Sequence, residues 1–459
     1  MHKFTAIILA AGMGKRMKSK MAKVIHPVAG RPMLLHVVDM VKQLNPEKII
    51  VVVGHQRERV EEILNETGTD IVLQEKQLGT GHAVLQTEKC FSQTPATVLI
   101  LNGDTPLLTE DIVKKLMELH FESNADITLL TAKIDNPNGY GRVIRDKESG
   151  ITRIIEDRDL KEEERGIDEI NVGIYVVETD FLFNALKGLR NDNSQNEYYL
   201  PDIIDAALKM GHKANALRVD TPEIVLGINN RIDLAFADKV LRRRVLERHM
   251  LEGVTIISPE TTFIDKDVKI GMDTIIYPNT YIEGKTDVGR ECIICPNTMI
   301  NNSRLGERVV IKNSSVVTDS VIEDDVSIGP FSHLRPGSTL KKRVKIGNFV
   351  EVKKTEVGEG SKANHLTYLG DTIIGRGVNI GAGTITCNYD GENKFQTIIE
   401  DDVFVGSDTQ LIAPVKIGKG AMIGAGSTIS KEVPPDSLAL SRTKQVNIKR
   451  KKGKRGKGK

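Results

Sequence analysis

The sequence predicts a Rossmann-like α/β domain followed by a hexapeptide-repeat, left-handed parallel β-helix. Two observations support this prediction. In the first half, short β-branched runs alternate with stretches of helical periodicity, which is typical of a parallel sheet. In the second half, an aliphatic residue followed by glycine recurs at intervals near multiples of six. The composition agrees, because aromatic residues make up only 4% of the chain, whereas it contains 40 glycines.

The first half alternates strand-like and helix-like segments. The strand-like runs are residues 4–10, 49–53, 70–73 and 98–101, and the helix-like stretches between them are residues 33–44 and 58–64. This alternation predicts a parallel sheet with helices on both faces. Ligands of such sheets bind beyond the carboxyl ends of the strands, so we expect functional residues in the loops that follow strands.

The second half shows a six-residue repeat from about Gly253. The aliphatic–glycine pairs start at Ile270, Val288, Leu305, Ile328, Ile346, Val357, Ile374, Ile380, Val405, Ile417 and Ile423. Six residues form one short strand and its corner, and three such units close a triangular coil with inward-pointing aliphatic side chains. So many pairs argue against an ordinary β-sandwich with chance glycine spacing. The left-handed crossovers of this fold are an exception to the right-handed rule.

These patterns divide the chain into four predicted segments. Residues 1–229 form the α/β domain, 230–251 a linker helix, 252–445 the β-helix and 446–459 a basic tail. The linker helix has an apolar stripe from Ile232 to Leu246, and its arginines at 242–244 are expected to face solvent. The tail carries eight Lys or Arg residues from Lys449 to Lys459 and no acid, so we expect disorder. Attraction to nucleic acid or to membranes is the alternative for the tail.

Charge and cysteine content exclude several classes of protein. A formal net charge of +2 argues against a protein built to bind nucleic acid. No leader of charged and then apolar residues follows Met1, and no apolar run has membrane-spanning length, so no stable membrane insertion is expected. The four cysteines lack disulfide or zinc spacing, and Cys292 and Cys295 are expected to be packed thiols. We therefore expect a cytoplasmic protein.

A basic loop with two glycines, LAAGMGKRM at residues 9–17, follows the first strand. Glycines two residues apart permit a turn whose N–H groups cradle phosphate oxygens, and Lys15 and Arg16 add positive charge. Lys23 follows a few residues later and can reach the same anion. The loop has neither the Gly-Lys-Ser/Thr of a Walker loop nor a third glycine, so a purely structural turn is the alternative.

An acidic loop follows a later strand in the segment LNGDTPLL, which places Asp104 beside a glycine. A carboxylate there suits Mg²⁺, which bridges one or two carboxylates to substrate phosphates. A helix cap or a turn acid is the alternative for Asp104 taken alone. The basic residues of the first loop favour the metal interpretation.

These segments, together with QLGTGHA at 77–83, GYGR at 139–142 and NEYYLPDII at 196–204, resemble the nucleotide-diphospho-sugar transferases, specifically bacterial sugar-1-phosphate uridylyltransferases. The resemblance implies that a sugar-1-phosphate oxygen attacks the α-phosphorus of UTP in line while pyrophosphate leaves. It assigns Leu9, Ala10, Ala11, Gly12, Gln74, Gly79 and Thr80 to the nucleoside, Gly141, Glu156 and Asn171 to the N-acetylated sugar, Asp104 and Asn229 to Mg²⁺, and Arg16 and Lys23 to charge stabilisation.

Five positions depart from the pattern of that family, and none of them is an assigned ligand. Lys15 stands where Thr is usual, Ala22 where Pro is frequent, Asp157 where His is usual, Val172 where Thr is usual and Asn196 where Gly is usual. Lys15 and Val172 lie beside assigned positions, so we expect them to affect rate and sugar preference.

Polar residues interrupt the repeat of the second half twice. In SKANHLTYLGD, residues 361–371, His365 is the natural candidate for a general base near neutral pH. A lone histidine is more often structural, but Asn364 and Tyr368 beside it indicate a polar cleft. In GAGTITCNYDGENKF, residues 381–395, a polar loop replaces the six-residue period, and such a break usually has a function. Arg335 and Lys353 suit a sugar phosphate.

These segments resemble the acetyltransferase half of the bifunctional bacterial GlmU family, and both sets of motifs occur in the family order from Thr5 to Arg442. The resemblance implies that His365 deprotonates the amine of glucosamine-1-phosphate, which attacks acetyl-CoA. The product, N-acetylglucosamine-1-phosphate, then reacts with UTP to give UDP-N-acetylglucosamine. The family also implies a homotrimer with acetyl sites at subunit boundaries. Glucosamine-1-phosphate is assigned to Arg335, Lys353, Tyr368 and Asn379, and acetyl-CoA to Ala382, Asn388, Tyr389, Ser407, Ala425 and Arg442.

Two other functions remain open from the sequence alone. A single-activity sugar-1-phosphate nucleotidyltransferase with a regulatory β-helix would keep the first set of motifs but would need neither His365 nor the Asn388–Tyr389 loop. A β-helix scaffold with a degenerate first domain would have lost its phosphate and metal residues. The chain retains those residues, namely Gly14, Arg16, Lys23, Asp104 and Asn229.

Overall fold

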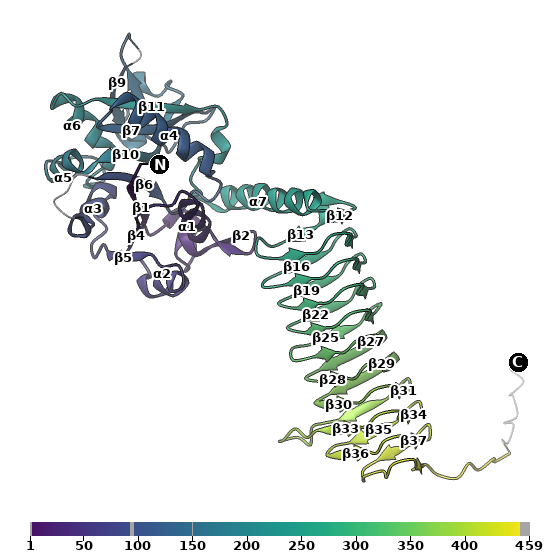
Figure 1. The fold of residues 1–459 in the computed structure, drawn as a ribbon. Coiled ribbons are helices and arrows are strands. Elements are labelled where there is room, and N and C mark those ends of the chain that lie inside the picture. The colour runs from purple at the N-terminus through teal and green to yellow at the C-terminus, as the bar shows by residue number, and fades with distance from the viewer. Residues whose placement is uncertain (1, 92–95, 149, 450–459) are drawn as a thin grey trace, which may run out of the picture. The chain divides into compact units, whose positions relative to one another are not determined.

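The computed structural model describes residues 2–91, 96–148 and 150–449, and Figure 1 shows their fold. The chain divides into two compact units, Met1–Arg242 and Arg243–Lys459. The boundary between them lies inside helix α7, Arg231–Leu251, which matches the helix predicted at 230–251 to within a residue. The limits of the four predicted segments stay predictions, and positions 450–459 of the predicted tail lie outside the described residues.

The first unit contains a mixed sheet. Among the described residues it has nine strands in the order β11-β7-β10-β6-β1-β4-β5, with β8 paired to β10 and β9 paired to β8. Their bounds are β1 Phe4–Ala10, β4 Lys48–Val53, β5 Asp70–Leu73, β6 Thr97–Asn102, β7 Ile127–Lys133, β8 Arg142–Arg145, β9 Ile151–Ile155, β10 Glu169–Glu178 and β11 Ala214–Val219. β1 pairs in parallel with β4 and β6, as predicted.

The four predicted strands are parallel, but the sheet also contains antiparallel strands that were not predicted, because β10 runs antiparallel to both β6 and β7 and β8 pairs antiparallel with β9 and β10. The chain reaches β10 through the β8–β9 hairpin, whose strands are antiparallel to each other. A parallel neighbour would have required a long crossover connection, usually a helix.

Helices cover both faces of this sheet, as the alternating pattern predicts. They are α1 Met33–Gln43, α2 Arg57–Leu64, α3 Thr80–Leu85, α4 Glu110–Ser123, α5 Thr179–Lys187 and α6 Ile203–Lys209. Ala6 and Ile8 of β1 belong to one apolar cluster with Val37 of α1, whereas Ile7 belongs to a second cluster with Phe181 of α5. Because side chains alternate across a strand, the central strands contribute to two separate cores.

The carboxyl ends of β1 and β6 lie next to each other. Leu9 near the end of β1 pairs in register with Asn102, the last residue of β6. The loops that carry Arg16 and Asp104 therefore leave the sheet at the same edge, which is the edge where parallel sheets bind ligands.

Helix α7 follows its predicted apolar stripe only in part. Ala237 and Leu241 pack in the core of the first unit. Ile232, predicted to begin the stripe, is 81% exposed, because the first turn uses Asp233 to bind the backbone N–H of Asn229 at 2.8 Å. Arg244, predicted to face solvent, is half-buried, and this burial lowers its pKa.

The second unit is a stack of short parallel strands running from β12 (Thr255–Ile256) to β39 (Leu438–Ala439), visible as successive coils in Figure 1. Ile276, Ile294, Ile311 and Ile328 pair one with the next, in steps of 18, 17 and 17 residues. Three six-residue units account for this step. Strands used below are β23 Val321–Ile322, β25 His333–Leu334, β27 Lys345–Lys353, β29 Lys362–Gly370, β30 Thr372–Ile374, β31 Asn379–Ile380, β32 Ile385–Cys387, β33 Thr397–Ile399, β34 Phe404–Val405 and β37 Met422–Ile423.

Aliphatic side chains fill the interior of these coils, and the glycine that follows them has a steric reason. Ile294, Ile311 and Ile328 are fully buried. A Cβ atom on Gly289 would lie 2.2 Å from the carbonyl oxygen of Gly306, so adjacent coils stack too closely for a side chain at this corner.

The four cysteines, all of which lie in the described part of the chain, are free. Cys292 is buried in the aliphatic core of the coils, and Cys295 is partly buried. These positions agree with the predicted packed thiols. Within the described residues, every helix is too short or too polar to cross a membrane.

Truncating an inward residue of the β-helix tests this packing. Leu334 of β25 is fully buried, so Leu334→Ala is expected to lower the free energy of unfolding of the second unit by about 2–5 kcal/mol. The control Val321→Ala, on β23, removes a side chain that is 45% exposed and should change it by about 0.5 kcal/mol or less. Urea unfolding followed by circular dichroism measures both. Equal losses would contradict the inward orientation of Leu334.

Candidate active sites

A cavity of about 280 Å³ at the carboxyl edge of the sheet brings together many of the predicted residues. The residues that line it come from the loops after β1 and β6, the β8–β9 hairpin, β10 and the segment that precedes α7. Of the predicted residues, it is lined by Leu9, Arg16, Thr80, Asp104, Gly141, Glu156, Asn171 and Asn229. The sequence therefore identified both sides of this cavity.

Lys23 joins the two predicted metal ligands. Its Nζ forms an ion pair with the carboxylate of Asp104 and donates a hydrogen bond to Oδ1 of Asn229 at 3.2 Å. Arg16 Nη2 donates to the same Oδ1 at 2.8 Å. Gly14 makes this arrangement possible, because it has a φ of 60° and a Cβ there would lie 2.6 Å from Cβ of Lys23.

The start of α7 holds Asn229 in place through a reciprocal cap. Oδ2 of Asp233 accepts hydrogen bonds from the backbone N–H groups of Asn229 at 2.8 Å and Asn230 at 3.1 Å. In return, Oδ1 of Asn230 accepts from the backbone N–H of Asp233 at 3.0 Å. The cap satisfies N–H groups that a helix terminus otherwise leaves without partners, and it fixes Asn229 beside the cavity.

The Gln74–Thr80 loop forms a rigid support beside the cavity. Nε2 of the buried Gln74 donates to the carbonyl oxygen of Gly79 at 3.0 Å. Gly79 has a φ of 106°, and a Cβ there would lie 2.6 Å from the carbonyl oxygen of Tyr198, so no other residue fits easily. Unlike Leu9 and Thr80, five of the residues predicted to hold the nucleoside are not among those that line the described cavity, namely Ala10, Ala11, Gly12, Gln74 and Gly79, and Lys23 is not among them either.

The predicted sugar contacts form a second group in the lining of the cavity. The backbone N–H of Asn171 donates to the carbonyl oxygen of Gly141 at 2.8 Å. A register shift in β10 between Asn171 and Tyr175 redirects Asn171, whose Nδ2 donates to the Tyr175 hydroxyl at 2.7 Å. A Cβ on Gly141 would lie 3.3 Å from Oε1 of Glu156, so the backbone passes close to this carboxyl.

Burial raises the pKa of Glu156 to about 7, and the negative charges of Asp202, Asp159, Asp157 and Glu197 add to this effect. Burial also raises the pKa of Asp202 to about 6. Perturbed carboxyl groups of this kind cluster at functional sites. Glu156 can therefore present either a proton donor or an acceptor to a ligand near neutral pH.

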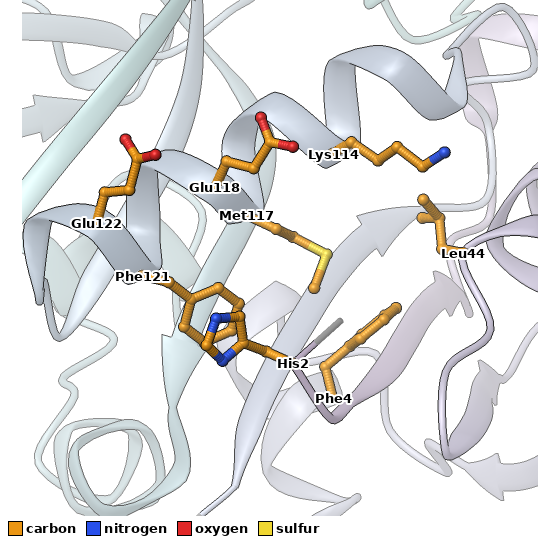
Figure 2. Close-up of a pocket in the computed structure, with 8 residues that line it drawn as sticks. All are labelled: His2, Phe4, Leu44, Lys114, Met117, Glu118, Phe121 and Glu122. Atoms are coloured by element: carbon orange, nitrogen blue, oxygen red, sulfur yellow. The ribbon is translucent and has the colours of Figure 1, made fainter.

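A second cavity, of about 270 Å³, lies on the first unit near the start of β1 and is lined by residues of α4 and Leu44 (Figure 2). The rings of His2 and Phe121 stack there with centroids 3.8 Å apart. Its lining is mainly apolar and contains no predicted site residue, so it carries none of the phosphate or sugar chemistry described above.

In the second unit, His365 sits on β29 beside a partner that the sequence analysis missed. Its Nδ1 lies 2.9 Å from Oδ1 of Asn348, which occupies the register position directly opposite on β27. If Nδ1 carries the proton in this hydrogen bond, Nε2 is left with a free lone pair. His365 is exposed, so a substrate can reach that nitrogen.

Three cations gather on the coils of β25 and β27 and in the polar loop. Leu334 and Val352 pair in register, which places the following residues, Arg335 and Lys353, on adjacent coils. The pKa of Lys353 is lowered first by the neighbouring ammonium of Lys394 and further by Arg335. Lys394 was not predicted, although it lies in the polar loop that the sequence analysis singled out. The repulsion among these cations would be relieved by a bound phosphate.

Tyr368 and Asn379 lie on different faces of the coil. Tyr368 pairs with Glu351 and with Ile385 of β32, whereas Asn379 of β31 pairs with Lys362. Leu366, with a φ of 35°, forms the corner between Lys362 and Tyr368. Tyr368 therefore lies on the face that carries Arg335 and Lys353, whereas Asn379 lies on the face before the corner.

Three of the predicted acetyl-CoA residues form a column on successive coils. The carbonyl oxygen of Ala382 accepts from the backbone N–H of Asp408 at 2.7 Å, and that of Ser407 accepts from Gly426 at 2.8 Å. Arg442 Nη1 donates to the carbonyl oxygen of Ala425 at 2.9 Å. Ala382, Ser407, Ala425 and Arg442 are thus brought together as predicted.

The polar loop that breaks the repeat lies between β32 and β33. Asn388 is buried and its Nδ2 donates to the carboxylate of Asp371, while Tyr389 is exposed and its hydroxyl donates to the carbonyl oxygen of Gly391. A β-bridge joins Tyr389 to Lys394, which closes the loop. Asn388 therefore anchors the loop, and Tyr389 presents a ring to solvent.

Comparisons with known proteins cover both halves of the chain. A MobA-like NTP transferase domain matches residues 6–157, and bacterial transferase hexapeptide repeats match residues 267–302, 319–354 and 396–431. The bifunctional protein GlmU of Geotalea uraniireducens is 50% identical over 97% of this chain and 98% of its own length. Its counterparts from Trichlorobacter lovleyi (96% of this chain and 96% of its own) and Listeria welshimeri (97% and 97%) are 49% and 48% identical.

The chain belongs to the bifunctional GlmU family. The predictions of family, of the α/β and left-handed β-helix fold, and of a bifunctional transferase in UDP-N-acetylglucosamine synthesis are confirmed. The single-activity and scaffold alternatives are set aside. The roles of individual residues stay predictions.

Several residues of this GlmU chain that line the first cavity escaped the sequence analysis. They include Asn102, Tyr140, Gly173, Tyr175 and Pro201. Tyr140 lies inside the GYGR segment, from which only Gly141 was predicted as a ligand contact. A Cβ on Gly173, which has a φ of 81°, would lie 2.5 Å from Nδ2 of Asn102, and only the fold brings these two segments together.

The departures from the family pattern have local explanations at three positions. Asn196 adopts a φ of 53°, a conformation that Asn tolerates better than most residues in place of Gly. Val172 lines the cavity directly, and Asp157 pairs with the buried Arg142 at 3.3 Å. Nothing in the structure explains Lys15.

The raised pKa of Glu156 predicts a pH-dependent stability of the first unit. A carboxyl whose pKa is higher in the folded state than in the unfolded state stabilises the fold fully below pH 4.5 and loses this contribution as pH rises through about 7. Glu156→Gln should remove a pH-dependent contribution of about 3 kcal/mol or less between pH 4.5 and 8. Urea unfolding at several pH values measures it. Glu162→Gln, at a 93% exposed side chain, should leave the profile unchanged.

Proposed function

We propose that the cavity of the first unit transfers the uridylyl group of UTP to N-acetylglucosamine-1-phosphate, and that the His365 site of the second unit acetylates glucosamine-1-phosphate. The observation that carries this assignment is the grouping of the residues in and beside the cavity. Arg16, Lys23, Asp104 and Asn229 contact one another in one group, and Gly141, Glu156 and Asn171 lie together in a second. A polyphosphate fits the first group and an N-acetylated sugar fits the second.

Positive charge on the phosphate side stabilises the transition state. The sugar-1-phosphate oxygen attacks the α-phosphorus of UTP, the bond to the β-phosphate oxygen breaks, and pyrophosphate leaves with the electron pair. Arg16 and Lys23 face the negative charge that grows on the transferred phosphoryl oxygens. Because both cations are hydrogen-bonded to Asn229, they are oriented before the substrate arrives.

The same side offers ligands of the kind that Mg²⁺ prefers. The carboxylate of Asp104 and the amide oxygen of Asn229 are both oxygen donors, and a single ammonium, that of Lys23, contacts both. No group of three His, Cys, Asp or Glu residues in the described chain could hold a metal by itself. Substrate phosphates and water would therefore complete the coordination. When bound, Mg²⁺ would neutralise charge on the phosphates.

Acetyl transfer in the second unit needs a base and a phosphate site. His365 Nε2 takes a proton from the amine of glucosamine-1-phosphate, the amine nitrogen attacks the thioester carbonyl of acetyl-CoA, and the CoA thiolate leaves. Asn348 holds the imidazole through Nδ1. Arg335, Lys353 and Lys394 bind the sugar phosphate, and the Ala382–Ser407–Ala425 column with Arg442 binds acetyl-CoA.

A homotrimer explains two features of the β-helix. Apolar side chains at Phe404, Met422 and Leu438 form an exposed column on one face, with exposures of 46%, 51% and 64%. Asn379 pairs directly with Phe404, at the end of this column, away from Arg335 and Lys353. Packing this face against another subunit would bury the column and bring Asn379 to a neighbour's site. The four free cysteines support a cytoplasmic location.

The two activities are expected to be separable. His365→Ala should lower acetyl transfer by about 10²–10⁴-fold because it removes the base, and should leave uridylyl transfer nearly unchanged. Asp104→Ala should abolish Mg²⁺-dependent uridylyl transfer and leave acetyl transfer nearly unchanged. Release of CoA and of pyrophosphate by the purified chain measures each step. Normal acetylation by the His365 variant would show that another group is the base.

Disrupting the apolar column should separate assembly from the first activity. Met422→Glu, on β37, is expected to convert trimers to monomers and to abolish acetyl transfer, because it places a charge in the interface. The matched control is Ile373→Glu on β30, where the side chain is 44% exposed. Ile373 pairs with Glu356 on one side and Ile398 on the other, outside the apolar column, so this variant should remain trimeric. Analytical ultracentrifugation measures the mass. A trimeric Met422→Glu variant would contradict the proposed interface.

A further inference from the structure

Arg142 is the largest side chain that the first unit buries almost completely, with only 1% of it exposed. Its guanidinium makes three hydrogen bonds. Nε donates to the carbonyl oxygen of Ile167 at 3.0 Å, Nη1 donates to the carbonyl oxygen of Tyr140, and Nη2 donates to Oδ1 of Asp157 at 3.3 Å. One planar group thus connects three separate segments of the chain.

Each of these segments carries one predicted sugar contact. Tyr140 precedes Gly141, Asp157 follows Glu156, and Ile167 lies in the loop that leads into β10 and Asn171. Backbone pairing also joins these segments, because Arg142 pairs in register with Ile155 of β9 and with Ile170 of β10. The guanidinium adds side-chain hydrogen bonds that tie the turn at Tyr140, the residue after Glu156 and the loop before β10 to this backbone frame.

The chemistry of this junction requires arginine. Three acceptors in three directions around one plane match the fixed fork of a guanidinium, whereas an ammonium on a flexible stem cannot hold all three at once. A buried charge also needs a counter-charge. Asp157 supplies it, and its side chain is 28% exposed, so it is reached by solvent while Arg142 is not.

We propose that Arg142, held by Asp157, is a positioning residue that fixes the N-acetylated-sugar side of the cavity and so determines sugar-phosphate affinity, independently of nucleotide binding. The proposal rests on the proposed uridylyl transfer. Neither residue lines the cavity or touches the substrate side directly. Their effect passes through Gly141, Glu156 and Asn171, whose placement they set.

The test is Arg142→Lys in the full chain, with Arg145→Lys as the matched control. Arg145 lies on the same strand and makes a bidentate ion pair with Glu169, with N–O distances of 2.8 and 2.7 Å, away from the cavity. For uridylyl transfer, Arg142→Lys should raise KM for N-acetylglucosamine-1-phosphate about 10- to 100-fold and KM for UTP by about twofold or less. Arg145→Lys should change neither, even where its thermal stability falls equally.

Asp157→Asn supplies a second test, alone and combined with Arg142→Lys. It should raise KM for the sugar phosphate about threefold in the native background and leave it unchanged in the Arg142→Lys background, as a double-mutant cycle requires for residues that act together. An effect that persists in the Arg142→Lys background would show that Asp157 acts directly on the adjacent Glu156, and would overturn the proposal.

The outcomes distinguish the positioning role of Arg142 from the proposed uridylyl transfer. An equal rise in both KM values for Arg142→Lys, or no greater change than for Arg145→Lys, would overturn the positioning role. Absence of pyrophosphate release from the unmodified chain with UTP, Mg²⁺ and N-acetylglucosamine-1-phosphate would instead overturn the proposed function. Acetyl transfer by the second unit should stay unchanged in every variant, and it reports that the protein is intact.

Discussion

The contact of Lys23 with Asp104 and Asn229 is the interaction on which the organisation of the first unit depends. Lys23 comes from the segment after β1, Asp104 from the loop after β6 and Asn229 from the turn before α7. The first two segments meet because β1 and β6 are parallel neighbours, and the third is joined to them by the hydrogen bond from Ile228 N–H to the carbonyl oxygen of Asp104. The ammonium between a carboxylate and an amide oxygen gives each of the three groups a partner. Arg16 donates to the same amide oxygen, so its orientation is linked to this contact.

The β-helix is stabilised by contacts between adjacent coils rather than by contacts between distant segments. Each coil bonds only to its neighbours, so the interior is a stack of equivalent layers and a residue's surroundings are set by its place in the repeat. Function then requires that the repeat be broken. The loop anchored by Asn388 is such a break. The regular coils therefore form the interior, and the loop that interrupts their repeat depends on those coils for its position.

Much of the fold and of the candidate sites could be predicted from the sequence. The features that could not be predicted depend on contacts between segments that are distant in the chain. β1, β5 and the repeat were predicted correctly because apolar periodicity is a local signal. The antiparallel direction of β10 and the shift of register at Asn171 were not, because they depend on pairing between distant strands. Arg142 and Lys394 look like ordinary charged residues in sequence, and only tertiary structure shows that one is buried and the other faces Lys353. The exposure of Ile232 shows the reverse case, a periodic signal that capping overrides.

Successive coils of the second unit rise by a constant distance, so equivalent residues are separated by multiples of that distance. Adjacent parallel strands are separated by about 4.8 Å, so the column from Ala382 through Ser407 to Ala425 measures about 10 Å along the axis. Arg442 stands at the far end of that distance and His365 lies near its beginning. In the proposed function, acetyl-CoA would lie along this column and contact several coils rather than enter one enclosing pocket. Deletion of one coil would shorten the column from Ala382 to Ala425 by the spacing of one strand, about 4.8 Å, and would leave the hydrophobic interior intact.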